Sequence, residues 1–531
     1  MKLRLTALIC GVLAFLTCAT VSTTAQDVPV GTSCTAPRVR RSWNEYTTAE
    51  RSLYLEAVST AMTRGFHQKF VELHIEFFSE QEAHRNCMFI YWHRMYLLGY
   101  ENMLRSLDPK FECVTLPFWD HLAATALRAS KQCSNVENCA RIVTDFGGSR
   151  QGRTMTLRVY NVSIVPRSPG RCISASVLGS FCGNNTGCAG CIVRGAPYNY
   201  EYPAEADLPS IYRQLFSSNT WEGFATNVER GVHNVMHSVM GGTMSYLQSP
   251  IDPIFYSHHS FIDLLQSVYL KCQLGDETAL IPVEERAKDD RLWANCSRRN
   301  GGQFQPEDLI TMRTRAFNAT WVHVRTTPQN TLYPFFKDLP GRFVDYVDAK
   351  DLGPYSYTYA YTGALTNLFK NCQDSNTAAA ANVLIADDEQ SARYADVMIK
   401  GVKHKVLRPA FREPNKYENR MRRWTIAIFE AARISGYTSV AAREQMEMML
   451  CVFAKECYGA VEDLSEEFRE HFHVKGPPRC LAIVDEVKRG VRIIGVPRWR
   501  SLTRKFFTCK RGTAFAKALA LEADAFMATE R

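Results

Sequence analysis

The chain has 531 residues, of which 46% are hydrophobic and 22% are charged, and its formal net charge is +9. These fractions are those of an ordinary globular protein, which excludes a disordered chain or a long coiled coil. The length suffices for a large core and a second domain. The charge excess is mild and no basic run is interleaved with aromatic residues, so nucleic acid is a poor partner.

The N-terminus is typical of a secretory leader. Lys2 and Arg4 precede an apolar stretch to about residue 19, and a small-residue cleavage site follows at Thr23-Thr24-Ala25. We expect residues 1–25 to be a signal peptide. No later segment has the length and apolar character of a membrane span, so we expect a soluble, secreted mature protein.

Cysteines and glycosylation motifs agree with secretion. Of the 18 cysteines, sixteen remain when the two in the leader are set aside, and an even number in an exported chain indicates disulfide bonds. Four N-x-S/T motifs would allow glycosylation in a eukaryotic host. They begin at Asn161, Asn184, Asn295 and Asn318.

The first part of the chain is predicted to be helical. Apolar residues recur three and four apart over residues 45–78, and a second helix is predicted from about 86 to 107, where Asp108-Pro109 ends it. Residues 130–200 differ, because they are rich in cysteine, glycine, serine and asparagine. We expect a disulfide-pinned excursion there, with cysteines clustered at Cys182, Cys188 and Cys191.

Helical patterns return over residues 207–240 and 253–270. The tyrosine-alternating stretch at 350–362 suits a strand. An alanine- and aspartate-rich piece at 374–390 is a plausible linker. Residues 391–531 are mostly helical in pattern, and their four cysteines are Cys451, Cys457, Cys480 and Cys509.

Histidines fall into two blocks. Of the 13 histidines, nine lie within residues 67–121 and 233–259. Neutral imidazole is the commonest transition-metal ligand, and two sets of three suggest two metal ions. The predicted ligands are His74, His84 and His93 in the first set and His233, His237 and His259 in the second.

In the second set, His233 and His237 are four residues apart, so on a helix they share one face. Pro253 can open a further helix that carries the third ligand. His258 and His259 are neighbours, about 100° apart on a helix, so only one should face the metal. We favour His259, because it lies four residues before Asp263, which gives it a nearby carboxylate.

In the first set, His84 and His93 are nine residues apart, which on one continuous helix places them on opposite sides. They can share an ion only if His84 precedes the helix, with Asn86 near its start. His74 belongs to the preceding helix. His67, seven residues before it on about the same face, is the rival ligand, although a histidine in a helix interface is its simpler interpretation.

Both blocks resemble the type 3 dicopper proteins, which are the tyrosinases, the catechol oxidases and, more distantly, the hemocyanins. The first block has the forms F-V-x-x-H at 70–74 and F-x-x-W-H-R at 89–94. The second has H-N-x-x-H, G-G-x-M and D-P-x-F-x-x-H-H-x-x-x-D within 233–263. TLPFWDH at 115–121 is similar to the segment that follows the first copper helix, and the resemblance covers roughly residues 38–365.

The resemblance implies a mainly α fold in which a central four-helix bundle holds two copper ions, with a mostly helical C-terminal extension. The implied activity is that of a secreted tyrosinase, which ortho-hydroxylates monophenols and oxidises o-diphenols to o-quinones with dioxygen. Glu229 and Asn234 match residues thought to hold a water that accepts the monophenol's proton. Catechol oxidation alone, a hemocyanin-like dioxygen carrier and a zinc-binding or structural protein are the alternatives.

Arg94 and Asp263, each close in sequence to a predicted ligand, are expected to support the metal site from outside. Glu82 stands where some relatives carry a thioether-forming cysteine, so that crosslink cannot form here. The partners are dioxygen and small phenols, without nucleic acid or membrane, and the oligomeric state is left open.

The expected organisation is a signal peptide at 1–25, a dicopper domain at 26–373, a linker at 374–390 and a C-terminal domain at 391–531. The last domain matches no motif. Two roles are open for it: a packing or interaction domain, or a lid that limits entry of phenols to the dicopper cleft.

Overall fold

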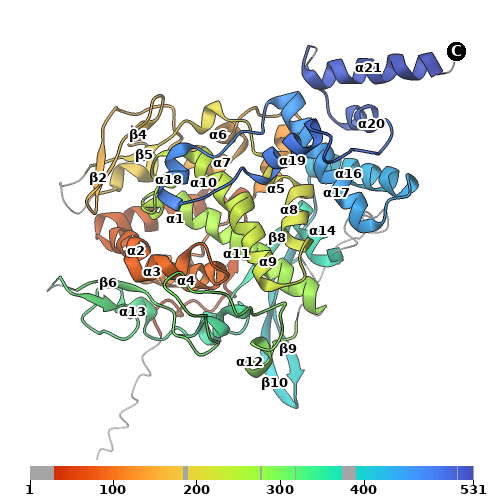
Figure 1. Ribbon diagram of the computed structural model, residues 1–531. Coiled ribbons are helices and arrows are strands. Elements are labelled where there is room, and N and C mark those ends of the chain that lie inside the picture. Colours follow the sequence, from red (N-terminus) through yellow and green to blue (C-terminus); the bar gives the residue numbers. More distant parts are fainter. Residues whose placement is uncertain are drawn as a thin grey trace, which may run out of the picture.

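Figure 1 shows the computed structural model of the chain. The described residues are 29–182, 189–275, 278–316, 319–372, 390–510 and 512–529. The expected signal peptide and nearly all of the expected linker therefore lie outside the described part. No described helix combines the length and apolar character that crossing a membrane requires.

The protein is mainly helical, and four helices form its centre: α2 (Phe66–Ile75), α4 (Phe89–Ser106), α10 (Asn234–Met240) and α11 (Ile254–Leu274). Nearly every side chain of α4 and most of α11 are buried. A helix buried on all sides lies in the interior of a bundle. The predicted central bundle is therefore present, and it includes both histidine blocks.

The helix expected over residues 45–78 is divided into three: α1 (Thr48–Thr63), α2 and α3 (Phe77–Ala83). Thr47 and Glu50 form a capping box that begins α1. Gly65, at φ 80°, separates α1 from α2, because glycine adopts this left-handed conformation without steric cost. Glu76 is extended between α2 and α3, and its carboxylate accepts from the Ser79 amide.

The excursion at residues 130–200 is pinned by disulfides, as expected for its described part. Two hairpins lie in it, β2 (Leu157–Val159) with β3 (Val162–Ile164) and β4 (Arg171–Ile173) with β5 (Ile192–Arg194). Its described disulfides are Cys133–Cys139 and Cys172–Cys191. Cys182 is also disulfide-bonded, whereas Cys188 and Asn184 lie outside the described residues.

The expected tyrosine-rich strand is β8 (Thr358–Thr362). It pairs in parallel with β1 (Val39–Arg40) on one side and with β11 (Ala410–Arg412) on the other. Since β11 follows the expected linker, the C-terminal part contributes a strand to a sheet of the central domain.

Three further disulfides join described residues of the expected dicopper domain. They are Cys34–Cys113, Cys87–Cys296 and Cys272–Cys372.

The C-terminal part begins with a hairpin of β9 (Arg393–Ile399) and β10 (Val402–Arg408). Its helices α16 (Lys416–Ile434), α17 (Ser439–Phe453) and α19 (Arg479–Lys488) then enclose a second apolar core, which also takes in Ala126, Ala129 and Ala204. Cys451–Cys480 and Cys457–Cys509 pair all four of its cysteines internally.

One C-terminal helix lies apart from the others. α18 (Glu466–Phe472) packs beside α10 of the central bundle, as Figure 1 shows. Leu464, Phe468 and Phe472 form a small apolar cluster there with Val235 of α10. The C-terminal part thus reaches the helices that carry the second histidine block.

The remaining helices and strands are mostly short. They are α5 (His121–Ala129), α6 (Val136–Cys139), α7 (Arg141–Asp145), α8 (Leu208–Phe216), α9 (Trp221–Val228), α12 (Val283–Arg286), α13 (Tyr333–Phe336), α14 (Gly363–Asn371), α20 (Trp499–Phe506), α21 (Ala514–Thr529), β6 (Arg313–Arg315) and β7 (Trp321–His323).

Candidate metal centre

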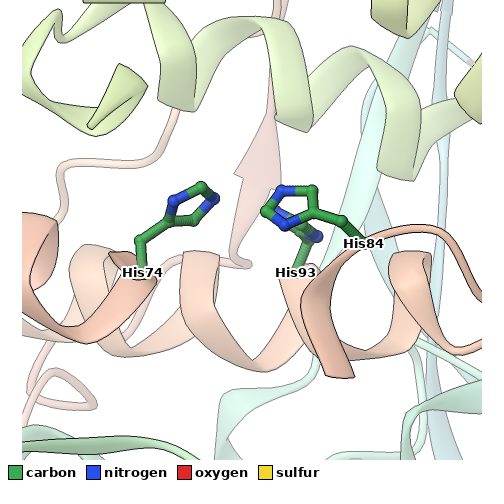
Figure 2. A group of neighbouring side chains, drawn as sticks. All are labelled: His74, His84 and His93. Carbon is green, nitrogen blue, oxygen red and sulfur yellow. The ribbon is translucent and has the colours of Figure 1, made fainter. Parts of the chain in front are cut away.

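The first histidine set converges in the bundle interior. His74 comes from the last turn of α2, His84 follows α3 in extended backbone, and His93 lies in α4. One nitrogen of each ring lies within 4.8 Å of the others, and all three residues are buried. Figure 2 shows the three rings pointing into one space.

The nine-residue spacing of His84 and His93 is accommodated as the sequence required, with His84 before the helix. Asn86 holds the loop between α3 and α4. Its amide nitrogen donates to the carbonyls of Gln81, Glu82 and His84, and its oxygen accepts from the Met88 amide. The loop that presents His84 is therefore fixed by one half-buried side-chain amide rather than by regular structure.

The second set lies on the facing helices. His233 ends a π-helical turn, η6 (Glu229–His233), His237 lies in α10, and His258 and His259 lie in α11. Nitrogens of His233, His237 and His258 lie within 4.8 Å of one another. His259 also borders this group, with its Nε2 3.4 Å from Nε2 of His237.

Hydrogen bonds fix the tautomers of four of these rings. Each ring's Nδ1 donates to an oxygen, so its Nε2 keeps a lone pair. The bonds are His74 to the Leu247 carbonyl (2.7 Å), His93 to the Phe89 carbonyl (2.8 Å), His237 to the Met244 carbonyl (2.7 Å) and His233 to the Asn234 side-chain oxygen (2.9 Å).

Three of these four Nε2 atoms lack protein partners. Nε2 of His74, His93 and His233 is buried without a hydrogen bond, and so are both ring nitrogens of His84. Buried polar atoms in folded proteins are nearly always paired, and groups left unpaired need an explanation such as a bound ion. These nitrogens face one another in two clusters, so a pair of metal ions is that explanation.

His258 and His259 differ in their partners. Nδ1 of His258 is 3.1 Å from Nε2 of His121, which leaves Nε2 of His258 buried and unpaired. His259 has its Nδ1 unpaired instead, and its Nε2 faces that of His237. Each therefore has a nitrogen available to an ion. The choice of His259 over His258 stays a prediction that the copper content of the His259→Ala protein would test.

Burial keeps these imidazoles neutral. Desolvation, followed by the neighbouring imidazoles, holds the pKa of His74, His93, His233, His258 and His259 well below the usual value. Burial lowers the pKa of His237 to about 3. Neutral imidazole is the form that binds a metal.

His67 lies outside the first set. Its Nδ1 is 2.9 Å from the Tyr100 hydroxyl and its Nε2 is 3.0 Å from the Ile251 carbonyl. Both nitrogens are therefore engaged in bonds between helices, which matches the simpler interpretation of this residue as an interface histidine.

Asp263 was expected to assist His259, but its carboxylate is bound by other residues. The Asp263 carboxylate accepts from Nε of Arg94 (2.6 Å), from Arg40 (3.2 Å) and from the hydroxyls of Tyr357 and Tyr359. Nδ1 of His259 has no hydrogen bond. The expected carboxylate–histidine contact is therefore absent, because four donors already occupy the carboxylate.

What Asp263 and Arg94 do instead is join the two ligand helices. Arg94 belongs to α4, one residue after His93, and Asp263 belongs to α11, four residues after His259. Burial acts to raise the pKa of Asp263, but Arg94 and Arg40 outweigh it and lower that pKa. The buried ion pair thus fixes the spacing between the first and second histidine sets.

Glu229 and Asn234 line one cavity of about 470 Å³. Glu229 is buried, its carboxylate accepts from the Arg85 amide (2.7 Å), and burial raises its pKa to about 8. Asn234 bonds His233. The two residues predicted to act together on a substrate proton therefore share a wall next to the second histidine set.

Sequence comparisons agree with this centre. A family model described as the common central domain of tyrosinase matches residues 64–271, which contain both histidine blocks. A tyrosinase of Streptomyces glaucescens is 30% identical over 246 residues, which are 43% of this chain and 80% of that protein. The chain belongs to the tyrosinase family.

Two further proteins are similar to this chain over different shares of their own length. A tyrosinase-like protein of Pinctada maxima is 31% identical over 197 residues, 35% of this chain and 39% of that protein. The structure of a polyphenol oxidase variant from Thermothelomyces thermophila aligns with a TM-score of 0.39 and 20% identity, over 62% of this chain and 90% of that one.

Tyrosinase-family proteins are oxidoreductases with a binuclear copper site, and the residues present here fit that cofactor. The two sets are all imidazole, which suits copper, and no thiolate competes, since the neighbouring Cys87 is disulfide-bonded to Cys296. The nitrogens left without hydrogen bonds supply the ligand atoms.

Two features of this tyrosinase-family site escaped the sequence. Glu229–His233 is a π-helical turn rather than α-helix, because Gly231 is non-helical (φ −89°, ψ −119°) and the Val232 amide donates to the Gln214 side chain. The glycine inside an otherwise helical pattern was its only signal.

The second missed feature is Phe472 of α18. Its ring lies 5.7 Å from that of His84 and 5.4 Å from that of His237, so it touches one histidine of each set. Phe468 stacks on Phe472 at 4.5 Å. Nothing local marks these phenylalanines, because the contact joins segments more than 200 residues apart.

Proposed function

We propose that this protein oxidises phenols with dioxygen at a dicopper centre held by His74, His84, His93, His233, His237 and His259. The observation that carries the proposal is the pair of facing, buried imidazole clusters, in which several ring nitrogens, among them Nε2 of His74, His93 and His233, lack hydrogen-bond partners. Two copper ions, when bound, supply dioxygen binding and accept the electrons of the phenol.

The finer proposal is that the protein both hydroxylates monophenols and oxidises o-diphenols. A monophenol must lose its proton to react, so a base close to the substrate is needed. Glu229 lines the cavity, and its pKa of about 8 places it between a carboxylic acid and a base near neutral pH. Asn234 lines the same wall, where it can orient a water between Glu229 and the phenol.

An enzyme is favoured over a dioxygen carrier by the cavity. A space of about 470 Å³ beside the second histidine set is of the size that holds a small aromatic molecule. Binding of dioxygen alone needs no such space. A catechol oxidase without monophenol hydroxylation is the second candidate, and Glu229 is the residue that separates the two.

We further propose that the C-terminal part acts as a lid, through Phe472. The phenylalanine ring contacts His84 of the first set and His237 of the second, so we infer that it limits the access of a phenol to both. The loop that carries α18 is closed by the Cys451–Cys480 disulfide, so its ends stay anchored to the C-terminal core. Release of Phe472 therefore requires a movement or a cut within residues 451–480.

Secretion with removal of residues 1–25 remains a proposal as well. Seven disulfides among the described residues suit an oxidising compartment. The glycosylation motifs at Asn161 and Asn295 begin at exposed residues. N-terminal sequencing of the protein from the medium of a eukaryotic host tests this directly.

The test of function uses copper-loaded Phe472→Ala protein, in which the proposed lid is open, with p-cresol as the monophenol and methylcatechol as the diphenol. Quinone formation from both supports the full proposal. Glu229→Gln should reduce hydroxylation of p-cresol by about 10²-fold or more and spare methylcatechol, with Glu222→Gln as a control on the same cavity wall. Oxidation of methylcatechol alone by the Phe472→Ala protein would leave a catechol oxidase, and oxidation of neither would refute the proposal.

A further inference from the structure

The cavity beside the second histidine set, which Asn234 joins to His233, has a charged mouth. Besides Glu229 and Asn234 it is lined by three cationic side chains, Arg85, Arg230 and Lys475. Glu222 is the acidic residue among its other lining groups, and His473 adds positive charge only when protonated. In the copper-free protein burial raises the pKa of Glu229 to about 8, so its carboxyl group opposes these cations little there near neutral pH.

Two of the cations are free to act on a ligand. Arg85 lies 3.5 Å from the Glu80 carboxylate, which also binds Arg299. Neither Arg230 nor Lys475 forms an ion pair within the described residues, and both are exposed. Arg230 interacts electrostatically with Glu229, and an exposed lining cation outside any ion pair also acts on a charged group that enters the cavity.

Arg230 and Lys475 lie at the exposed rim of the cavity. Arg230 directly follows Glu229, and the Arg85 amide is the donor to the Glu229 carboxylate. A phenol whose hydroxyl points toward Glu229 and the histidines therefore directs its para substituent outward, past Arg230. Lys475 faces the same space from the segment that follows α18.

We propose that this mouth selects phenols that carry a carboxylate on their side chain, with Arg230 as the main specificity-determining residue and Lys475 as its partner while the lid is closed. This inference rests on the proposed phenol oxidation. A guanidinium binds a carboxylate through paired N–H donors. An ammonium-bearing phenol meets like charge in the same place and is disfavoured.

The kinetic test compares three catechols of similar size in the Phe472→Ala protein: hydrocaffeate (anionic), methylcatechol (neutral) and dopamine (cationic). Arg230→Gln should raise KM for hydrocaffeate roughly threefold, since an exposed charge pair contributes less than about 1 kcal/mol. It should leave methylcatechol unchanged and lower KM for dopamine. Added salt should weaken the preference for hydrocaffeate in the Phe472→Ala protein, but not in the same protein that also carries Arg230→Gln.

Arg420→Gln is the matched control, because it removes the same charge from an exposed position of α16 outside the cavity. Equal KM ratios among the three catechols in Arg230→Gln and Arg420→Gln would overturn the inference. Lys475→Gln tests the second cation in the parent protein, whose lid is closed, through the binding measurement that follows.

A binding measurement separates this inference from the proposed function. Phenylacetate has no phenolic hydroxyl, and its affinity for the copper-free protein can be measured by ligand-observed NMR. Arg230→Gln should weaken its binding about threefold relative to Arg420→Gln, and benzyl alcohol should show no such difference. Loss of this difference refutes the charged mouth, whereas failure of methylcatechol oxidation with the difference retained refutes only the proposed reaction.

Discussion

Replacement of Phe472 by alanine should convert a closed enzyme into an open one. Phe472 is 4% exposed and packs on His84, His237 and Phe468. Burial of a phenylalanine side chain contributes about 1.5–3 kcal/mol. If this term holds α18 in place, its loss raises the open fraction by roughly 10- to 100-fold, since each 1.4 kcal/mol is a factor of about ten.

The assay is dioxygen uptake with methylcatechol, at equal copper content in the parent and in Phe472→Ala. Phe515→Ala is the control, because Phe515 is fully buried in the second apolar core and belongs to the same C-terminal part. A rise in rate for Phe472→Ala alone supports a lid at the centre. Equal rates for Phe472→Ala and the parent would refute it, and an equal rise in both variants would indicate general loosening of the C-terminal part.

Three further predictions concern the centre itself. His259→Ala should lower the copper content to about one ion per chain and abolish turnover, and retention of both ions in it, with loss in His258→Ala, would reverse the ligand assignment. Hydroxylation of p-cresol should rise with pH roughly tenfold per unit below the pKa of Glu229, because only the carboxylate accepts the proton; that pKa is about 8 without metal and lower with copper cations beside it, and a pH-independent rate across this range would contradict the role. Asp263→Ala leaves Arg94 and Arg40 buried without their carboxylate, so it should destabilise the fold by about 3–5 kcal/mol and weaken copper binding about 10- to 100-fold; an unchanged melting temperature and copper affinity would leave the ion pair without a role in the centre.

The histidine sets were predictable because their geometry is local. Four-residue spacing places His233 and His237 on one helix face, and the nine-residue spacing of His84 and His93 demands a break before α4, which the structure has. Family motifs supplied the rest. The mainly helical fold followed from apolar periodicity, although Gly65 and Glu76 divide the first expected helix.

What the sequence could not supply depends on distant contacts. Asp263 was expected to assist His259, and this was wrong. Its carboxylate is occupied by Tyr357, Tyr359 and Arg40, which come from other parts of the chain. The place of Phe472 over the centre has the same origin.

The boundary near the expected linker also depends on tertiary structure. The C-terminal part adds β11 to a sheet of the central domain and shares its apolar core with residues of α5. Truncation there would remove a paired strand and expose apolar surface, so we expect it to destabilise the protein. A point substitution at Phe472 is the cleaner test of a lid.

The central claim, phenol oxidation at a pair of copper ions, is tested most directly by titrating copper into the metal-free Phe472→Ala protein while dioxygen uptake with methylcatechol is recorded. The account predicts that uptake rises with added copper and levels off at two ions per chain. A plateau at one ion per chain, or no uptake with both ions bound, would contradict it.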